Sequence, residues 1–229
     1  MLSTPPLTRT DWVDDRLRAE ILTGSIAPRE RVPVERLATR WNVSATPTRE
    51  SLRRLAGEGL ITLLPQRGAR VATIDARLAS DIYAVRAVLE PMALRQSMLH
   101  AARTEVEHDA FVVDVIRARD RLLESHLSID EFVVAHRDFH RTLLSRCTNR
   151  VLIEQIGQLT DRARLFQLLG GAANRRSDHR REHAELARLI IARDVDGAVD
   201  AVTSRLVLTL EVIARMVNPH ENPRQPRRP

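Results

Sequence analysis

The chain has 229 residues, of which 43% are hydrophobic and 29% charged, so it holds enough apolar material for one large domain or two small ones. No apolar run approaches the roughly 20 residues that a membrane span needs, and the N-terminal MLSTPPLTRT lacks the apolar core of a signal peptide. We therefore expect a soluble cytoplasmic protein without membrane association. The single cysteine, Cys147, agrees, because one cysteine forms no internal disulfide.

The net charge is +6, and all 36 basic residues are arginine. Residues 1–75 carry 12 arginines against nine acidic residues, whereas the middle of the chain is nearly neutral. A small positive excess at the N-terminal end is compatible with a polyanionic partner, but it does not establish one.

Three short helices and a hairpin are predicted in the first third of the chain. An apolar stripe that includes Trp12 runs over 11–23 and stops at Gly24, and a second helix follows over 33–41. The turn 42–44 leads at once into a third helix, which Ser44 or Thr46 caps and which ends at 57. The runs ITLL and ARVAT flank PQRG and predict a small β-hairpin. This order is that of a winged helix-turn-helix domain over residues 1–73.

From residue 76 onward the pattern becomes long and helical. Six helices are predicted, over 77–100, 104–126, 129–147, 149–169, 176–193 and 195–217. Short loops make neighbouring helices antiparallel, so residues 76–217 are expected to form an all-helical bundle. The proline- and arginine-rich tail 218–229 is expected to be disordered. The predicted fold class is thus mainly α, with one hairpin.

The third helix has the residues that a DNA-reading helix needs. Such a helix brings side chains of its first turns to base edges in the major groove, while arginines and hydroxyls hold phosphates. Thr46, Thr48 and Arg49 project from the first turn, and Arg53 lies one turn further along the face of Arg49. Arg67 lies at the predicted tip of the hairpin, where it is able to reach the adjacent groove. A helical domain with merely solvated arginines is the alternative at this point.

The line from residue 21 to 71 resembles the DNA-binding domain of the GntR family of bacterial transcription regulators. The segments that carry the resemblance are ILTGSIAP, VSATPTRESLRRLAGEGLI and QRGARV. The resemblance implies that Ser44, Thr46 and Arg49 contact DNA from the helix, and that Gly68 with Arg67 contacts it from the wing. Many members have arginine where this chain has Ala45, and a base-reading arginine is worth about 1–3 kcal/mol of discrimination. The FadR protein of this family has arginine near the start of its second helix, where this chain has Glu35. The operator should therefore differ from theirs.

Two pairs of histidines in the second half have the spacing of metal ligands. His136 and His140 are four residues apart, and His179 and His183 repeat the spacing, so each pair shares one helix face. Two such pairs facing each other would offer up to four nitrogen ligands to a divalent cation, of which Zn²⁺ is the best match. Packed or solvated histidines are the plainer alternative.

The segments YAVRAVLEPMA, FH, EH and DVDGAVDAVTSRL resemble the FCD effector-binding domain of the FadR-like branch, and six helices are typical of its VanR-like group. The resemblance implies an effector-contacting Arg86 and metal ligands at His136, His140 and His183. The fourth ligand position of the family falls on Arg205, a cation that does not bind metal. Two alternatives stay open. Either a divalent ion binds the three histidines, with or without His179, or Arg205 and Arg86 clamp a carboxylate without metal.

The resulting hypothesis is a homodimeric, ligand-responsive transcription regulator, not an enzyme. It binds a double-stranded DNA operator, and a small organic-acid effector in the helical domain changes its operator affinity. We expect a repressor. The alternative is a zinc enzyme with an accessory DNA-binding domain, but no HExxH spacing occurs, and Glu182 points away from the face of its neighbour His183.

Overall fold

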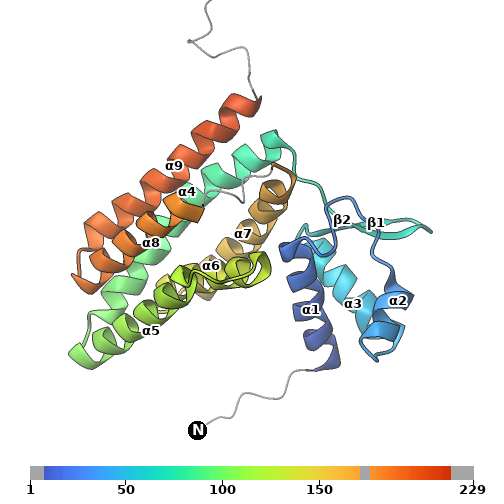
Figure 1. Ribbon diagram of the computed structural model, residues 1–229, viewed down its shortest axis with the longest axis horizontal. Helices are drawn as coiled ribbons and strands as arrows, with labels where there is room; N and C mark the ends of the chain where they lie inside the picture. Colours follow the sequence, from blue (N-terminus) through green and yellow to red (C-terminus); the bar gives the residue numbers. More distant parts are fainter. Residues whose placement is uncertain (1–7, 171–175, 218–229) are drawn as a thin grey trace, which may run out of the picture. The chain divides into compact units, whose positions relative to one another are not determined.

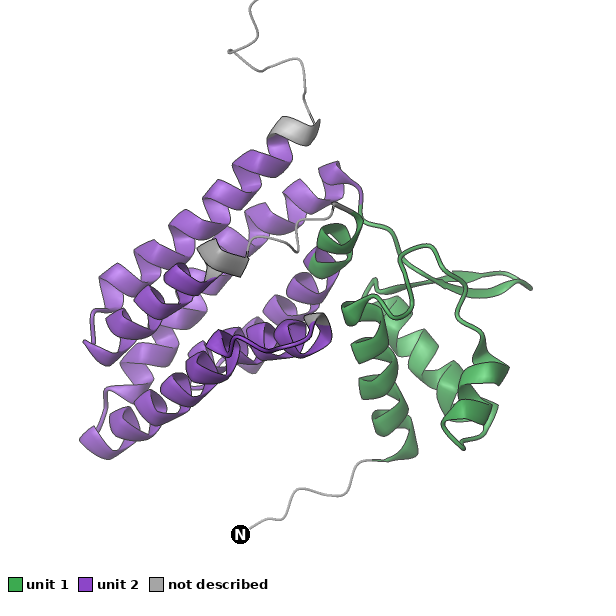
Figure 2. Ribbon diagram, in the orientation of Figure 1, with its two compact units in different colours: residues 1–74, 164–171 green, residues 75–163, 172–229 purple. Residues whose placement is uncertain are grey.

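The computed structural model describes residues 8–170 and 176–217, and these fall into two units (Figures 1 and 2). Unit 1 comprises residues 1–74 and 164–171, and unit 2 comprises residues 75–163 and 172–229. The break after Ile74 lies within the interval between the two predicted domains. The predicted tail, 218–229, lies outside the described residues. The fold class is confirmed: short N-terminal helices, a two-stranded hairpin and a longer helical part.

Helix α1 (Arg9–Thr23) is capped at both ends by adjacent residues, Thr8 and Gly24. The Thr8 hydroxyl accepts a hydrogen bond from the Asp11 N–H at 3.1 Å, and the Asp11 carboxylate accepts from the Thr8 N–H at 3.3 Å, which is a capping box. Gly24 ends the helix with a left-handed φ of 88°, a conformation that glycine adopts without a side-chain clash. The buried stripe is Val13, Leu17, Ile21 and Leu22, whereas Trp12, which belongs to the same apolar stripe of the sequence, is 41% exposed.

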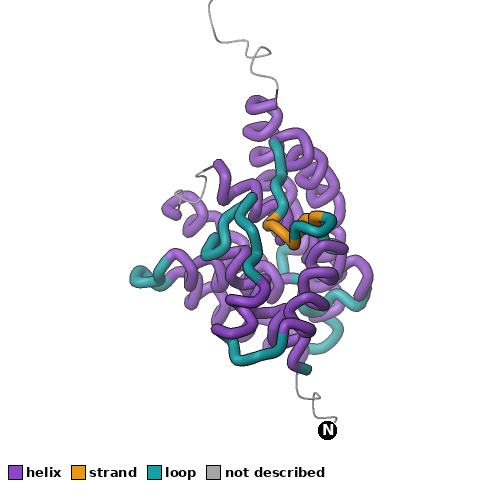
Figure 3. The backbone as a smooth tube through the Cα atoms, turned by 90° about the vertical axis from the view of Figure 1, so that its right-hand side faces the viewer, coloured by secondary structure: helices purple, strands orange, loops and turns teal. Residues whose placement is uncertain are grey.

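Helices α2 (Val34–Arg40) and α3 (Ala45–Gly57) follow with a four-residue turn between them. Helix α2 buries Leu37 and Ala38, and α3 buries Leu52 and Leu55 and packs against α1. Strands β1 (Ile61–Leu64) and β2 (Gly68–Val71) form the antiparallel hairpin, drawn in orange in Figure 3. Arg31 forms an isolated bridge to Arg70, which ties the loop before α2 to the hairpin.

Unit 2 contains the six predicted helices, with small shifts at their ends. They are α4 (Ala76–Ala101), α5 (Glu105–Leu123), α6 (Ile129–Leu143), α7 (Arg150–Gly170), α8 (Arg176–Ile191) and α9 (Val195–Val217), of which the end of α7 belongs to unit 1. Helices α4 and α9 lie side by side, as Figure 1 shows, and α8 packs against α9 and α5. Within the described ranges, no helix has the length and apolarity needed to cross a membrane.

Candidate functional site

The start of α3 exposes most of the side chains predicted to contact DNA. Ser44, Thr46, Arg49 and Arg53 are all exposed. Ser44 is the N-cap of α3, but its side chain makes no capping hydrogen bond, contrary to the prediction that it or Thr46 caps the helix. The Ser44 hydroxyl therefore remains available to another partner, beside backbone N–H groups of the first turn that favour a negative charge.

Thr48 is the exception, and its predicted contact with DNA is wrong. Its side chain is 0% exposed and belongs to the buried stripe of α3 with Ser51, Leu52 and Leu55. The periodicity contained this signal, because residues 48, 52 and 55 share one helix face. A buried hydroxyl does not reach a base edge, so Thr48 is part of the core.

Two of the arginines of α3 are paired with carboxylates. Nη2 of Arg49 donates to Oε1 of Glu35 on α2 at 2.7 Å, and Nη1 of Arg54 donates to Oδ1 of Asp11 on α1 at 2.8 Å. Both side chains of the first pair are well exposed, at 57% for Arg49 and 74% for Glu35. Arg53 has no ion pair within the described part of the chain. The sequence placed Glu35 near the start of α2 but did not predict that it meets Arg49.

The hairpin has the predicted exposed tip. Arg67 and Gly68 are both exposed, and Gly68 has a φ of 84°. A Cβ at Gly68 would meet nothing within 4 Å, so its backbone conformation, and not space, is what requires glycine there. The turn thus presents Arg67 to solvent at the end of the two strands.

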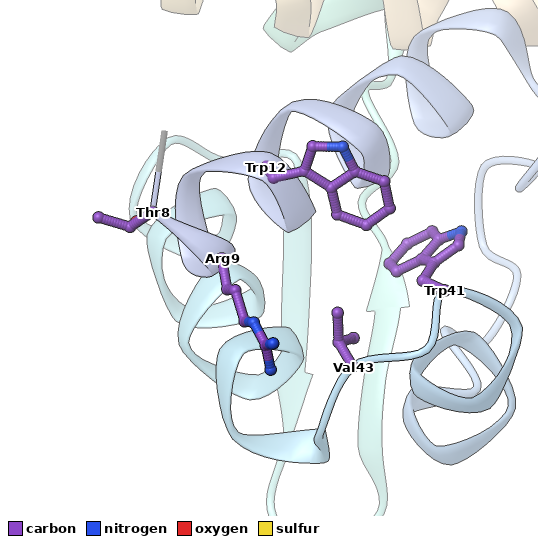
Figure 4. Close-up of a pocket in the computed structure, with 5 residues that line it drawn as sticks. All are labelled: Thr8, Arg9, Trp12, Trp41 and Val43. Atoms are coloured by element: carbon purple, nitrogen blue, oxygen red, sulfur yellow. The ribbon is translucent and has the colours of Figure 1, made fainter. Parts of the chain in front are cut away.

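A hollow of about 290 Å³ lies beside the turn that precedes α3 (Figure 4). It is lined by Thr8, Arg9, Trp12, Trp41 and Val43. The two tryptophan rings meet edge to face with centroids 6.2 Å apart, and the Arg40 guanidinium lies 5.4 Å from the centroid of Trp41. These contacts brace the turn between α2 and α3. No pattern in the sequence predicted the hollow.

In unit 2, three of the predicted metal ligands come together. His136 and His140 of α6 and His183 of α8 each offer one ring nitrogen, and these nitrogens lie within 4.8 Å of one another. Nε2 of His140 and Nε2 of His183 are 3.0 Å apart. Two nitrogens that each lie about 2.0–2.1 Å from one Zn²⁺ ion are separated by about 2.9–3.4 Å, so this spacing suits a shared metal. The side chain of His179 lies outside the described residues.

The surroundings keep His140 uncharged. Burial lowers the pKa of His140 well below its ordinary value, and the nearby Arg205 guanidinium lowers it further. Phe139, which is fully buried, packs edge to face against His140 and His183, with ring centroids 5.6 and 5.1 Å away. The neutral imidazole is the form that binds a metal ion, and the contacts with Phe139 restrict the positions of the two rings.

A buried charged group adjoins the histidines. Nε of Arg86 donates to Oε1 of Glu90 at 2.6 Å, and Nη2 of Arg205 lies 3.6 Å from Oε2 of the same carboxylate. Burial disfavours a charged Arg86, but charge interactions and hydrogen bonds with Glu90 and Tyr83 outweigh this and raise its pKa. For Arg205 burial prevails and the pKa is lowered. Nε and Nη2 of Arg205 are buried and lack a hydrogen-bond partner among the described residues.

This arrangement offers two kinds of binding. Three imidazoles are the ligand set of a metal site that keeps one position open for another ligand. The two N–H groups of Arg205 that lack hydrogen-bond partners are suited to a carboxylate, which accepts two parallel hydrogen bonds from a guanidinium. Cys147, in contrast, donates from Sγ to Oε1 of Gln96 at 3.3 Å and takes no part in the group.

Comparison with known proteins matches two family models to successive parts of the chain. Residues 9–71 match the family described as bacterial regulatory proteins, gntR family, and residues 81–207 match the FCD domain. The HTH-type transcriptional regulator BphR of Paraburkholderia xenovorans is 30% identical over 206 residues, which cover 86% of this chain and 82% of that protein. The HTH-type transcriptional repressor GlaR of Escherichia coli is 24% identical over 205 residues, covering 86% and 92%.

Solved structures support the fold. A putative GntR transcriptional regulator from Rhodococcus has a TM-score of 0.75 at 21% identity and covers 91% of this chain and 98% of its own. The Escherichia coli protein McbR/YncC has a TM-score of 0.73 at 20% identity and covers 93% and 100%. The similar proteins are transcriptional regulators, so the alternative of a zinc enzyme is set aside.

Proposed function

The chain belongs to the GntR family of bacterial regulatory proteins and carries an FCD domain, and from this premise we propose that a small organic acid controls its binding to an operator. The chain is a transcriptional regulator of the GntR/FCD type. The observation that carries the proposal is the start of α3, which leaves Ser44, Thr46 and Arg49 exposed. A regulator that acts on a bacterial operator works in the cytoplasm.

In the proposed complex α3 lies in the major groove. Arg49 reads a base edge, because a guanidinium fork matches O6 and N7 of guanine. Ser44 and Thr46 hold phosphates at the helix start, Arg53 extends the contact by one turn, and Arg67 with Gly68 reaches the next groove from the wing. The surface that makes these contacts lies entirely in unit 1.

Binding of the purified protein to its own upstream intergenic DNA tests this interface. We expect sequence-selective binding that weakens as salt rises from about 50 to 200 mM, because phosphate contacts release counterions. Arg49→Ala should lower selective binding by about 1–3 kcal/mol. Arg16→Ala removes the same charge from an exposed position of α1 and is the matched control. Equal losses in the two variants would contradict the proposed role of α3.

We propose that the effector is a carboxylate that reaches the buried N–H groups of Arg205. Two buried donors without hydrogen-bond partners cost free energy in the protein alone, and a ligand that accepts from both lowers that cost. Glu90 already neutralises Arg86, so Arg205 is the better anchor of the two. Arg86 contributes mainly by holding Glu90 in place.

The three histidines would hold a divalent cation, most suitably Zn²⁺, and the bound ion would offer an open coordination position to the effector. His136, His140 and His183 supply the donors, and Phe139 fixes two of their rings. Elemental analysis of protein purified without a chelator or a histidine tag tests this. About one ion per chain is expected; no ion, and none taken up on titration, would favour the metal-free carboxylate clamp.

A homodimer is proposed from an unpartnered apolar stripe on α4. Val85, Val88, Met92 and Leu99 are exposed and recur at the spacing of one helix face. On α9, which packs along α4, Val207, Leu208 and Val212 are also exposed. A second copy covering these residues would give the dimer two α3 helices, one for each half-site of an operator.

Control of transcription then follows from linkage. If the operator and the effector favour different arrangements of the dimer, the effector lowers operator affinity, and the operator lowers effector affinity by the same factor, typically about 1–3 kcal/mol of coupling free energy. We propose repression relieved by the effector. GlaR, to which the chain is similar, is named a repressor.

A further inference from the structure

We propose that Glu35 determines the sequence selectivity of this regulator by holding the Arg49 guanidinium in place for a base edge and away from phosphates. The inference rests on the proposed placement of α3 in the major groove. It starts from the 2.7 Å hydrogen bond between Nη2 of Arg49 and Oε1 of Glu35.

Stability does not explain this ion pair. Both side chains are more than half exposed, and exposed pairs contribute little to folding because water already solvates both charges. Among the described contacts, Arg49 is the one partner of the Glu35 carboxylate. A carboxylate beside a surface that meets phosphates also lowers affinity for every DNA sequence alike. A residue with a small structural benefit and a general cost to affinity is best explained by selectivity.

The geometry gives Glu35 two effects on Arg49. An arginine has five N–H donors, so one hydrogen bond to Glu35 leaves donors for the two acceptors of guanine. The bond also fixes a long side chain that would otherwise sample many rotamers, which lowers the entropy lost on reading a base. Because Glu35 carries a negative charge, a phosphate that competes for Arg49 has to displace it. Arg53, one turn along the same helix, has no such partner in the described chain and is the better phosphate contact.

The contrast with Arg54 supports the assignment. Arg54 is also paired, but its partner Asp11 belongs to α1, the helix that packs against α3. The partner of Arg49 belongs to α2, so this pair joins the two helices of the helix-turn-helix itself. Of the three arginines of α3, which are Arg49, Arg53 and Arg54, only Arg49 is hydrogen-bonded to α2 among the described contacts.

The test compares Glu35→Gln with the full-length wild type on its selected operator and on random DNA of equal length. We expect Glu35→Gln to bind random DNA several-fold more tightly, with a salt slope steeper by about one unit, because a freed Arg49 gains a phosphate contact. Operator affinity should change less, so the ratio of operator to random affinity should fall several-fold. Asp15→Asn removes an equal charge from the exposed face of α1 and should leave the ratio unchanged.

A second pair of variants separates the mechanism from simple charge removal. In an Arg49→Gln background, Glu35→Gln should no longer change the ratio, because the effect of Glu35 acts through Arg49. A ratio unchanged by Glu35→Gln in the wild type would overturn the inference. An equal fall of the ratio with and without Arg49 would also overturn it, since Glu35 would then act on DNA directly. If the wild type binds no operator selectively, the proposed function itself is contradicted. That result differs from the two outcomes above, in which the wild type is selective.

Discussion

Replacing Arg205 by methionine should stabilise the effector-free protein while abolishing its response to carboxylates. The Arg205 side chain has two buried donors, Nε and Nη2, that lack hydrogen-bond partners among the described residues. Methionine keeps much of the length of the side chain and removes the buried donors. Arg205→Met is thus expected to raise the free energy of unfolding.

The magnitude follows from the neighbours of Arg205. Each buried donor without a partner costs about 1–3 kcal/mol, and Arg205 has two. Loss of the ion pair with Glu90, at 3.6 Å, offsets part of this gain. That offset is limited because Glu90 keeps its 2.6 Å hydrogen bond to Arg86 and is not left unpaired. We expect a net stabilisation of about 1–3 kcal/mol, which raises Tm by about 3–10 °C in a chain of this size.

Thermal unfolding with and without a panel of organic acids measures both effects. In the wild type, an acid present at about 100 times its Kd should add about 2.7 kcal/mol of stability, and the variant should show no such gain. Arg95→Met removes an exposed guanidinium paired with Asp196 on the surface and should change Tm little. A variant that is less stable than the wild type and still responds to the same acid would refute this account of Arg205.

Three further predictions concern the metal, the dimer and the operator. His140→Ala should reduce the metal content in elemental analysis to background. His126→Ala, at a largely exposed position, should leave the metal content unchanged. Equal metal content in the two variants would argue against the site. Val88→Glu should shift the protein toward monomer in light scattering, because it introduces a charge into the apolar stripe of α4. Val106→Glu, at an exposed position of α5, should leave the dimer intact. A dimer in both variants would place the interface elsewhere. Ala45→Arg should alter base preference in a binding selection by about 1–3 kcal/mol at one position, and an unchanged preference would count against the placement of α3 in the groove.

The elements of the fold were predictable because their signals are local. The stripe over 11–23, the stop at Gly24 and the turn before α3 all arise from residues close in sequence, and the six later helices follow from long apolar periodicity. Errors arose where solvent exposure depends on packing. Trp12 belongs to an apolar pattern but lies half exposed beside Trp41, and Thr48 is polar but buried against the face of Leu52.

The candidate sites were predictable as residue types but not as contacts. The spacing of His136 and His140 put two rings on one face, but only the packing of α6 and α8 brings His183 within reach. The pairing of Arg49 with Glu35 depends on how α2 and α3 lie against each other, which no local pattern specifies. The buried Arg205 donors without hydrogen-bond partners likewise depend on the packing of α9, which carries Arg205, against α4, which carries Arg86 and Glu90.

Selection of binding sites from a random DNA library tests the central claim most directly. The full-length protein should enrich an inverted repeat whose half-sites lie about one helical turn apart, because a two-fold dimer presents two α3 helices. Arg49→Ala should enrich a repeat that has lost its base preference at the position that Arg49 reads, while Arg16→Ala should enrich the same repeat as the wild type. A library that shows no enriched sequence with the wild type, or the same repeat with Arg49→Ala, would contradict the account.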